Sequence, residues 1–206
     1  LVSQLANDDW SRSSELRLVI IGGDKALPER VARWHADVGP GIRLVNTYGP
    51  TEATVVATTC DLLAPHAEQQ AVSIGRSVAN THPYVLDQQL QPVVAGARGQ
   101  LYLGGANDSR GYLGDARLTA EKFIPDPFSH TPGARLYGTG DLGRWRHDGK
   151  IEFLGRTDQQ LKIRGHRIES PVGRRGSSPR IVVETVAHVL GAAAEIDPPR
   201  QPIRRP

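Results

Sequence analysis

The first part of the chain consists of short apolar runs separated by one amphipathic segment. The run Leu16 to Ile21 is closed by Gly22-Gly23-Asp24, a pattern typical of a buried strand that ends in a tight turn. The segment Pro28 to Val38 repeats apolar residues on one helical face and begins with proline, which favours a helix. Glycine and proline at positions 39–41 end that helix, and Ile42 to Val45 is the next apolar run. The pattern predicts a strand, a helix and a second strand, and therefore a parallel α/β layer with its ligand at the carboxyl ends of the strands.

In the middle of the chain, short runs of alternating apolar and polar residues replace the helical period. These runs span residues 84–87, 100–103, 142–146 and 150–154. Asp148-Gly149 lies between the last two runs, and it predicts a hairpin because both residues tolerate the positive φ of a tight turn. We therefore expect this part of the chain to form antiparallel β-structure.

One segment, Asn46 to Glu52, combines a turn with polar and aromatic side chains. It follows the run Ile42 to Val45 and precedes a β-branched run, Thr54 to Thr59, so Gly49-Pro50 is interpreted as a loop between two extended segments. An aromatic ring, an amide, a hydroxyl and a carboxylate are thus expected at one strand end.

These side chains suit a nucleotide. Tyr48 can stack on a purine, and Asn46 can offer its amide to a base edge. Thr51 can hydrogen-bond a phosphate oxygen, and Glu52 can hold a hard cation such as Mg²⁺, which prefers oxygen ligands. The alternative interpretation is a surface turn with an incidental tyrosine.

Composition narrows the class of protein. With 22 glycines and 15 prolines among 206 residues, many turns and short strands are expected. The chain begins at Leu1 and has no methionine, so we expect it to be a piece of a longer protein. Its single Cys60 cannot form an internal disulfide, which suits a reducing cytoplasm, and its β-branched surroundings predict a small buried side chain.

Charge and hydropathy exclude two kinds of partner. The net charge of +3 is too small to indicate nucleic-acid binding, because acidic and basic residues alternate over most of the length. No apolar run approaches the roughly 20 residues that a bilayer-spanning helix needs. We therefore expect neither a nucleic acid nor a membrane as partner.

The segment Asn46 to Glu52 resembles the adenine-binding motif of the adenylate-forming superfamily, particularly the amino-acid-activating adenylation domains of non-ribosomal peptide synthetases. Further resemblances follow in the family's order over more than a hundred residues. They are Gly99 to Gly105, Arg110 to Leu113, Leu118 to Phe123, Tyr137 to Leu142 and Gly155 to Glu169. Several motifs in the family's order are not expected by chance.

The resemblance implies a mixed α/β fold. The chain would form the C-terminal part of the large adenylate-forming subdomain and the start of the small C-terminal subdomain. Residues 1–71 would end the nucleotide-binding α/β sheet, 72–156 would form an antiparallel, barrel-like region, and 157–169 would hold the hinge and the start of the small subdomain. Residues 170–206 depart from the family and are expected to be a divergent or frame-shifted tail.

The resemblance also implies a reaction, in which an amino acid and ATP form aminoacyl-AMP and pyrophosphate. Thr51 and Glu52 would be the catalytic residues, and Gly49 would lie against the nucleotide. Asp141 would accept from the ribose hydroxyls and Arg156 would lie beside them, although Gly138 to Asp141 is also readable as a turn capped by aspartate.

Further roles concern the later thioester step. Asp158 would be the hinge residue, and Lys162, Arg164 and Gly165 would lie on the loop that faces the phosphopantetheine arm of a peptidyl carrier domain; an amphipathic strand is the alternative. Condensation domains would accompany the carrier in the parent chain. The positions that match the acyl pocket are mostly small and apolar, which suggests an aliphatic or modest amino-acid side chain; they are Ile20, Gly22, Thr47, Val55 and Val56.

Some elements of the family are not found in this sequence. It shows no Ser/Thr/Gly-rich phosphate loop with a lysine, no acidic partner for the substrate's amine and no catalytic lysine of the small subdomain. We therefore expect this chain alone to be inactive. Two other interpretations are a fragment of an acyl-CoA synthetase and a non-catalytic nucleotide-binding remnant.

Overall fold

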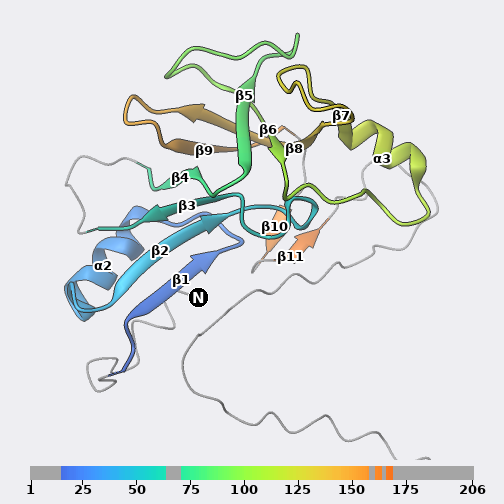
Figure 1. The fold of residues 1–206 in the computed structure, drawn as a ribbon. Helices are drawn as coiled ribbons and strands as arrows, with labels where there is room; N and C mark the ends of the chain where they lie inside the picture. Colours follow the sequence, from blue (N-terminus) through green and yellow to red (C-terminus); the bar gives the residue numbers. More distant parts are fainter. Residues whose placement is uncertain (1–14, 64–70, 158–160, 164–165, 169–206) are drawn as a thin grey trace, which may run out of the picture.

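The computed structural model describes residues 15–63, 71–157, 161–163 and 166–168. Most of the described strands belong to one nine-stranded sheet, in the order β1-β2-β3-β4-β9-β8-β6-β5, with β7 paired to β8 (Figure 1). Its strands are β1 (Leu18–Gly22), β2 (Arg43–Tyr48), β3 (Thr58–Asp61), β4 (Ser73–Ser77), β5 (Thr81–Leu86), β6 (Gly99–Gly105), β7 (Phe123–Pro125), β8 (Arg135–Trp145) and β9 (Ile151–Arg156). The other elements are α2 (Pro28–Val38), the 3-10 turn η2 (Thr51–Ala53), α3 (Ala116–Lys122), β10 (Leu161–Ile163) and β11 (His166–Ile168).

The predicted strand-helix-strand unit is confirmed. Strand β1 pairs in parallel with β2, so that Gly22 lies opposite Thr47 at the carboxyl ends of both strands. Helix α2 begins at Pro28 and packs Val31 and the fully buried Trp34 against this sheet.

The same hydrophobic cluster includes Cys60, which is 6% exposed. The expectation of a small buried side chain at this position is thus confirmed. Burial also raises the pKa of the Cys60 thiol.

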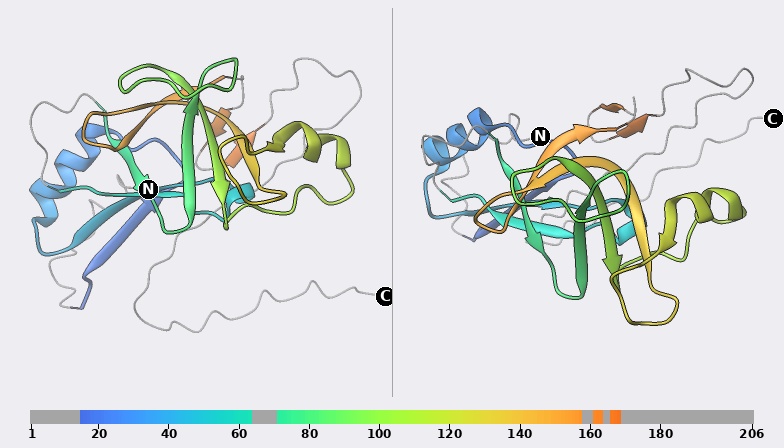
Figure 2. Two further views of the ribbon diagram at one scale, coloured as in Figure 1. Left: turned by 45° about the horizontal axis from the view of Figure 1, so that its top comes forward. Right: turned by 90° about the horizontal axis from the view of Figure 1, so that it is seen from above.

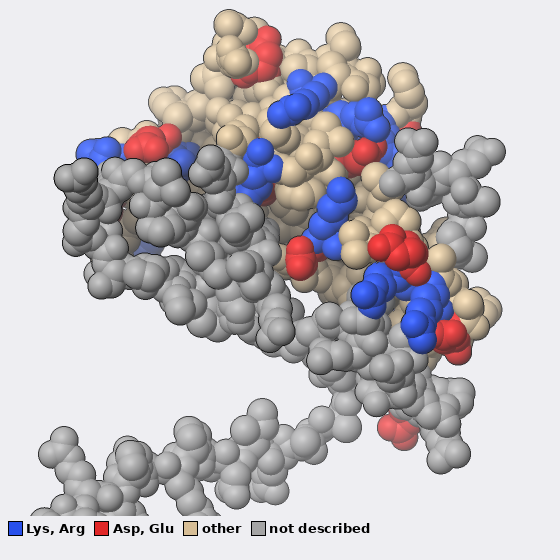
Figure 3. All heavy atoms as spheres, turned by 180° about the vertical axis from the view of Figure 1, so that it is seen from behind, with Lys and Arg blue, Asp and Glu red and all other residues tan. Residues whose placement is uncertain are grey.

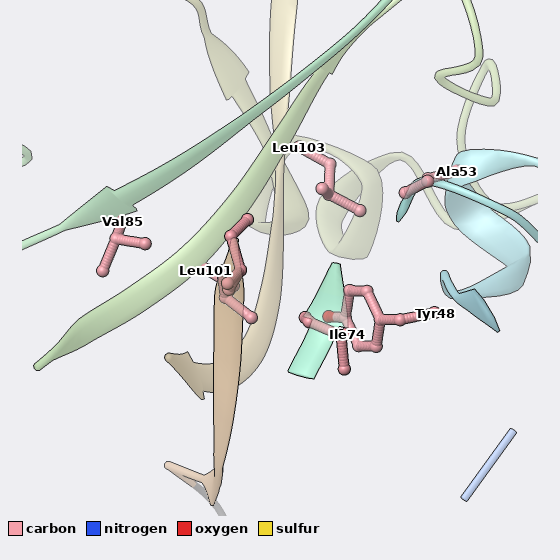
Figure 4. Close-up of a cluster of buried hydrophobic side chains, with 8 residues drawn as sticks. Tyr48, Ala53, Ile74, Val85, Leu101 and Leu103 are labelled. Carbon is pink, nitrogen blue, oxygen red and sulfur yellow. The ribbon is translucent and has the colours of Figure 1, made fainter. Parts of the chain in front are cut away.

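The remaining strands form an antiparallel sheet that curls around a second cluster. Strands β4 and β5 lie at opposite ends of the path β4-β9-β8-β6-β5, yet residues 78–80 alone connect them, so the path must bend back on itself (Figure 2). Inside the bend lie apolar residues from several strands (Figure 4). They are Tyr48, Ala53, Ala57, Ile74, Val85, Leu101, Leu103 and Ile151. The predicted antiparallel middle of the chain is confirmed.

Strand β4 joins the two halves of the sheet, because it pairs with both β3 and β9. The sheet is therefore continuous across residue 72, where the sequence predicts the change from the α/β part to the barrel-like part. The limits of the four predicted segments stay predictions, and residues 170–206 lie outside the described part of the chain.

The expectation of an extended run from Thr54 to Thr59 is partly wrong. Only Thr58 and Thr59 belong to β3, while Thr54 and Val55 have φ of 52° and 70°, in the left-handed region. Tertiary contacts override the β-propensity of these residues. The backbone N–H of Val55 donates to the Pro50 carbonyl, and the Thr54 hydroxyl donates to the carbonyl of a distant residue, Asn107.

Two further details differ from the sequence pattern. The hairpin between β8 and β9 is present, but its connection spans residues 146–150, and only Gly149 of the predicted pair has positive φ. Helix α3 was not predicted, because it is only seven residues long and buries none of its side chains, so it has no apolar face to detect.

On the face drawn in Figure 3, basic and acidic side chains lie interspersed among the described residues. Some charged side chains of the described residues form exposed ion pairs, such as Arg43 with Asp61. Within the described ranges, no helix is both long and apolar enough to cross a membrane.

Candidate functional site

The turn after β2 is closed, because the backbone of residues 53–57 packs against Gly49 and its two neighbours. The Pro50 carbonyl accepts hydrogen bonds from the N–H groups of Ala53 and Val55, and the Ala57 N–H donates to the Tyr48 carbonyl. A Cβ on Gly49 would lie only 2.6 Å from the Val55 carbonyl oxygen and 2.7 Å from the Ala57 nitrogen. Because other residues carry this atom, only glycine permits the closed turn.

Three predicted nucleotide-binding residues meet where β2, β8 and β9 come together. The Tyr48 hydroxyl donates to Asp141 Oδ2 at 2.6 Å, and Arg156 Nη1 donates to Asp141 Oδ1 at the same distance. Asp141 and Arg156 are also partners in the register of β8 and β9. Burial, together with the negative charge of Asp141, holds the pKa of Tyr48 well above its usual range, so Tyr48 remains a donor.

The backbone around Asp141 is also fixed. Its N–H donates to the Thr139 hydroxyl, which in turn donates to the Leu101 carbonyl in β6. Gly140 has a φ of 74°, and its carbonyl accepts from both the N–H and the hydroxyl of Thr157. The interpretation of Gly138 to Asp141 as a capped turn is therefore wrong, because these residues lie within strand β8, where Asp141 is 3% exposed.

Glu52 lies in η2, and its side chain meets a residue to which the sequence assigned no role. The Tyr112 hydroxyl donates to Glu52 Oε1 at 2.6 Å, and the Ser109 N–H donates to the Glu52 carbonyl at 2.8 Å. Tyr112 belongs to the Arg110 to Leu113 motif, so the motif was visible in the sequence, but its contact with a residue 60 positions earlier was not.

Asn46 and Thr51 differ in access. Asn46 is 3% exposed and its amide donates to the Ser73 carbonyl in β4 at 3.0 Å. Thr51 is exposed at the start of η2, where a ligand oxygen can reach its hydroxyl. The roles given to both, like those of Gly49, Tyr48, Asp141 and Arg156, stay predictions.

Each of the five predicted pocket residues is exposed or partly exposed, with Ile20, Gly22 and Thr47 on β1 and β2 and the two valines after η2. Gly22 faces Thr47 across β1 and β2, and the Thr47 hydroxyl donates to the Ile21 carbonyl at 3.0 Å. Ile20 is two residues before Gly22 and therefore on the same face of β1. Val55 is 42% exposed and Val56 is partly buried in the turn that follows η2.

The residues assigned to the hinge and the thioester step are only partly described. Lys162 lies in β10, which pairs with β11 in a separate two-stranded antiparallel sheet. Asp158, Arg164 and Gly165 lie outside the described residues.

The oxygen ligands around η2 suit Mg²⁺ only if the ion is also bound by the phosphates of the nucleotide. Among the described residues, no group of three or more His, Cys, Asp or Glu side chains could hold a metal ion. Mg²⁺ in nucleotide sites is commonly bound by one or two carboxylates together with substrate phosphates and water. Glu52 offers one such carboxylate, and Thr51 offers a neighbouring hydroxyl, so the residues present fit a cation that arrives with the phosphates.

Comparison with known proteins gives the family. The AMP-binding enzyme family matches residues 2–113, more than half of the chain. Tyrocidine synthase 3 of Brevibacillus parabrevis is 45% identical over 169 residues, which cover 82% of this chain and 2% of that protein. Phosphinothricin tripeptide synthetase PhsC of Streptomyces viridochromogenes is 48% identical over 154 residues, 75% of this chain and 13% of that protein. The chain therefore spans only 2% and 13% of the length of these two relatives.

Solved structures agree. PA1221, a non-ribosomal peptide synthetase protein containing adenylation and PCP domains, matches with a TM-score of 0.73 at 31% identity, over 81% of this chain and 29% of that one. The non-ribosomal peptide synthetase FmoA3 matches with a TM-score of 0.66 at 33% identity, over 75% and 17% respectively. This chain belongs to the AMP-binding enzyme family, and within that family it resembles part of the adenylation domains of non-ribosomal peptide synthetases.

Proposed function

We propose that this chain is part of a domain that activates an amino acid as its adenylate and passes it to a carrier. The observation that carries the proposal is the buried contact of Tyr48 and Arg156 with Asp141. Tyr48 is the last residue of β2, and this strand leads into the turn η2 that contains Glu52. A carboxylate fixed by two donors keeps further acceptor positions on its oxygens, and these suit the two hydroxyls of a ribose.

In the proposed reaction, a carboxylate oxygen of the amino acid attacks the α-phosphorus of ATP, and the bond to the pyrophosphate oxygen breaks. Enzymes of phosphoryl chemistry contribute mainly position and charge neutralisation. Asp141 would orient the ribose, and Thr51 would donate to a phosphate oxygen. Glu52 would hold Mg²⁺, which would supply positive charge to the phosphates.

The accessible residues at the ends of β1 and β2 and in the turn after η2 support an amino-acid substrate of modest size. Gly22 has no side chain, Thr47 is short, and Val55 is apolar and 42% exposed. The similarity to peptide synthetases favours transfer to phosphopantetheine on a peptidyl carrier domain, with condensation domains in the parent chain and the cytoplasm as location. Transfer to coenzyme A is the second candidate, and carrier-dependent thioester formation distinguishes the two.

Ribose binding provides a direct test. In isothermal titration calorimetry with this chain, AMP should bind roughly a hundredfold more tightly than 2′,3′-dideoxy-AMP, because two hydrogen bonds to a charged group are lost and each contributes about 1.5 kcal/mol. The Asp141→Asn variant should lose this preference, while Asp37→Asn, an exposed aspartate on α2, should keep it. Equal affinities of the unaltered chain for both nucleotides would contradict the assignment of Asp141.

Catalysis is a separate prediction. This chain alone should show no amino-acid-dependent exchange of pyrophosphate into ATP, because its sequence has no phosphate loop with a lysine and no catalytic lysine of the small subdomain. The complete domain of which it forms part should show exchange. Exchange by the isolated chain above background would refute the first expectation, and none by the complete domain would refute the proposed reaction.

A further inference from the structure

The segment between β6 and α3, residues 106–115, lies beside the turn η2 and forms several hydrogen bonds with it (Figure 1). The Ser109 N–H donates to the Glu52 carbonyl at 2.8 Å, and the Asn107 amide donates to the Ala53 carbonyl at 3.1 Å. In return, the Thr54 hydroxyl donates to the Asn107 carbonyl at 2.7 Å. Two hydrogen bonds to backbone carbonyls of η2, and one from the side chain of its C-cap Thr54, therefore hold this turn against a segment more than fifty residues away.

Tyr112, in the same segment, reaches the side chain of this turn. Its hydroxyl donates to Glu52 Oε1 at 2.6 Å, a short bond of the kind that ionised acceptors form. Its ring meets Phe123 edge-on, with centroids 6.0 Å apart, so the ring is held by packing as well. Burial and the hydrogen bond to Glu52 raise the pKa of Tyr112, and the hydroxyl stays a donor.

Helix α3 in turn fixes the backbone of Tyr112. The Tyr112 N–H donates to the Thr119 hydroxyl at 2.9 Å, and this hydroxyl donates to the carbonyl of Asp115, the N-cap of α3. Gly111 has a φ of 130°, and a Cβ there would overlap the Thr119 side chain. The helix therefore packs closely against the residue before Tyr112, and its cap connects to the tyrosine through one threonine.

Arg135 of β8 holds the same segment from the other side. Its guanidinium donates to the Ser109 carbonyl at 2.7 Å and to the Arg110 carbonyl at 3.1 Å. It also lies over the Phe123 ring at 4.9 Å from the centroid. Tyr112 is thus placed by a strand, a helix and an aromatic contact, all of them independent of η2.

We propose that Tyr112 is a positioning residue for Glu52, which it holds in the orientation that receives Mg²⁺ with the phosphates of ATP. The inference rests on the proposed function of Glu52 as a metal-binding carboxylate. A glutamate side chain that is free to rotate loses rotamer freedom when it binds a cation. A carboxylate that is already oriented by a hydroxyl does not, and partners of this kind commonly change metal affinity 10- to 100-fold.

The test uses Tyr112→Phe, which keeps the ring against Phe123 and removes only the hydroxyl. ATP binding to the chain is measured by calorimetry over a series of Mg²⁺ concentrations, and AMP binding is measured without metal. We expect the variant to need roughly tenfold more Mg²⁺ for half-maximal ATP affinity, with metal-free AMP binding unchanged. The matched control is Tyr84→Phe. Tyr84 belongs to β5 and stacks on Phe128, so its substitution should change neither the Mg²⁺ dependence of ATP binding nor the affinity for AMP.

A second variant separates positioning from general support. In the Glu52→Gln background, Tyr112→Phe should produce no further change in Mg²⁺ dependence, because the tyrosine acts through the carboxylate. Equal weakening of AMP and ATP binding, or additive effects of the two substitutions, would show a merely structural role and overturn the inference. An unchanged Mg²⁺ dependence in Tyr112→Phe would overturn it while leaving the proposed function intact. If the unaltered chain bound ATP without any Mg²⁺ dependence, this result would contradict the metal-binding role of Glu52 and therefore also the inference about Tyr112.

Discussion

At the scale of single residues, the three acidic residues that are buried in the described part of the chain each accept a hydrogen bond from another side chain. Asp141 is 3% exposed and contacts Arg156, and Glu152 is 9% exposed and accepts two hydrogen bonds from Arg144. Glu52, at 8% exposure, accepts from a tyrosine hydroxyl. A charge taken out of water requires such partners, because its desolvation is otherwise not compensated. The predicted site residues are thus also part of the charge balance of the fold.

Replacing Asp141 should therefore destabilise the protein as well as alter nucleotide binding. Asp141→Asn removes the negative charge at 2.6 Å from Arg156, whose side chain is only 12% exposed. We expect a loss of about 3 kcal/mol in the free energy of unfolding, measured by urea denaturation. Asp37→Asn, which breaks an exposed pair with Arg33, should change it by less than about 1 kcal/mol. Similar losses in both variants would show that burial of the ion pair is not the cause.

Asp108 should give the protein a pH-dependent stability. Burial raises its pKa from 3.8 to about 7, Asp126 adds to the rise, and Arg135 opposes it. Because the folded chain keeps a proton that the unfolded chain releases, stability should fall as pH rises from about 4 to about 7 and level off above that.

Asp108→Asn should remove this fall. The variant should match the unaltered chain near pH 4 and exceed its unfolding free energy by about 1 kcal/mol near pH 8, since partial exposure of the side chain screens much of the penalty. Urea denaturation at several pH values measures the difference. A gap that stays constant with pH would contradict the role of Asp108.

At the scale of elements, the two halves of the sheet meet at an irregular strand. Strand β4 changes register between Ser73 and Gly75 as it pairs with β9. The Ser73 hydroxyl donates to the Ile151 carbonyl and accepts from the Gly75 N–H, so the irregularity is hydrogen-bonded. Gly75 has a φ of 88° and lies against the backbone of Thr59 in β3. The bulge lets a single strand serve both halves.

Gly75→Ala should therefore be strongly destabilising. Its Cβ would overlap the Thr59 carbonyl in addition to the strain of the left-handed backbone, and we expect a loss of about 3 kcal/mol or more. Gly96 has the same φ of 88° but has open space around its Cβ position, so Gly96→Ala isolates the backbone strain, about 1 kcal/mol. Thermal or urea unfolding of both variants measures the difference. Equal losses would mean that the close approach to Thr59 is unimportant.

At the scale of the whole described molecule, two hydrophobic clusters share strands. Strand β2 contributes Leu44 to the cluster under α2 and Tyr48 to the cluster inside the curled sheet. Strand β4 continues the sheet from one cluster to the other through its pairing with β3 and β9. Because one strand carries residues of both clusters, we expect them to unfold together.

Leu101→Ala tests this coupling. Leu101 is fully buried in the curled sheet, and its truncation should cost about 3 kcal/mol. Hydrogen exchange should then show weaker protection of slowly exchanging amides in β1 and α2 as well as in β6. The control Val94→Ala, at a valine that is 78% exposed, should leave all of these amides unchanged. Loss of protection confined to the curled sheet would show that the two clusters unfold separately.

The sequence by itself determined the elements whose signal is local. The period of Pro28 to Val38 and the apolar runs on either side gave the strand-helix-strand unit, and alternation gave the antiparallel strands. The ordered motifs gave the family, since they need only residue types and spacing. Helix α3 was not predicted from the sequence because it is short and buries no side chain, so no periodic pattern marks it.

Only the tertiary structure decided which functional groups touch. The Tyr48 hydroxyl meets an aspartate 93 positions later, and the Tyr112 hydroxyl meets a glutamate 60 positions earlier. It also decided that Thr54 and Val55 adopt left-handed backbone despite their β-propensity. The physical reason is the same in each case. These hydrogen bonds join segments that the sheet brings together, and local preference is weaker than the requirement that buried polar groups find partners.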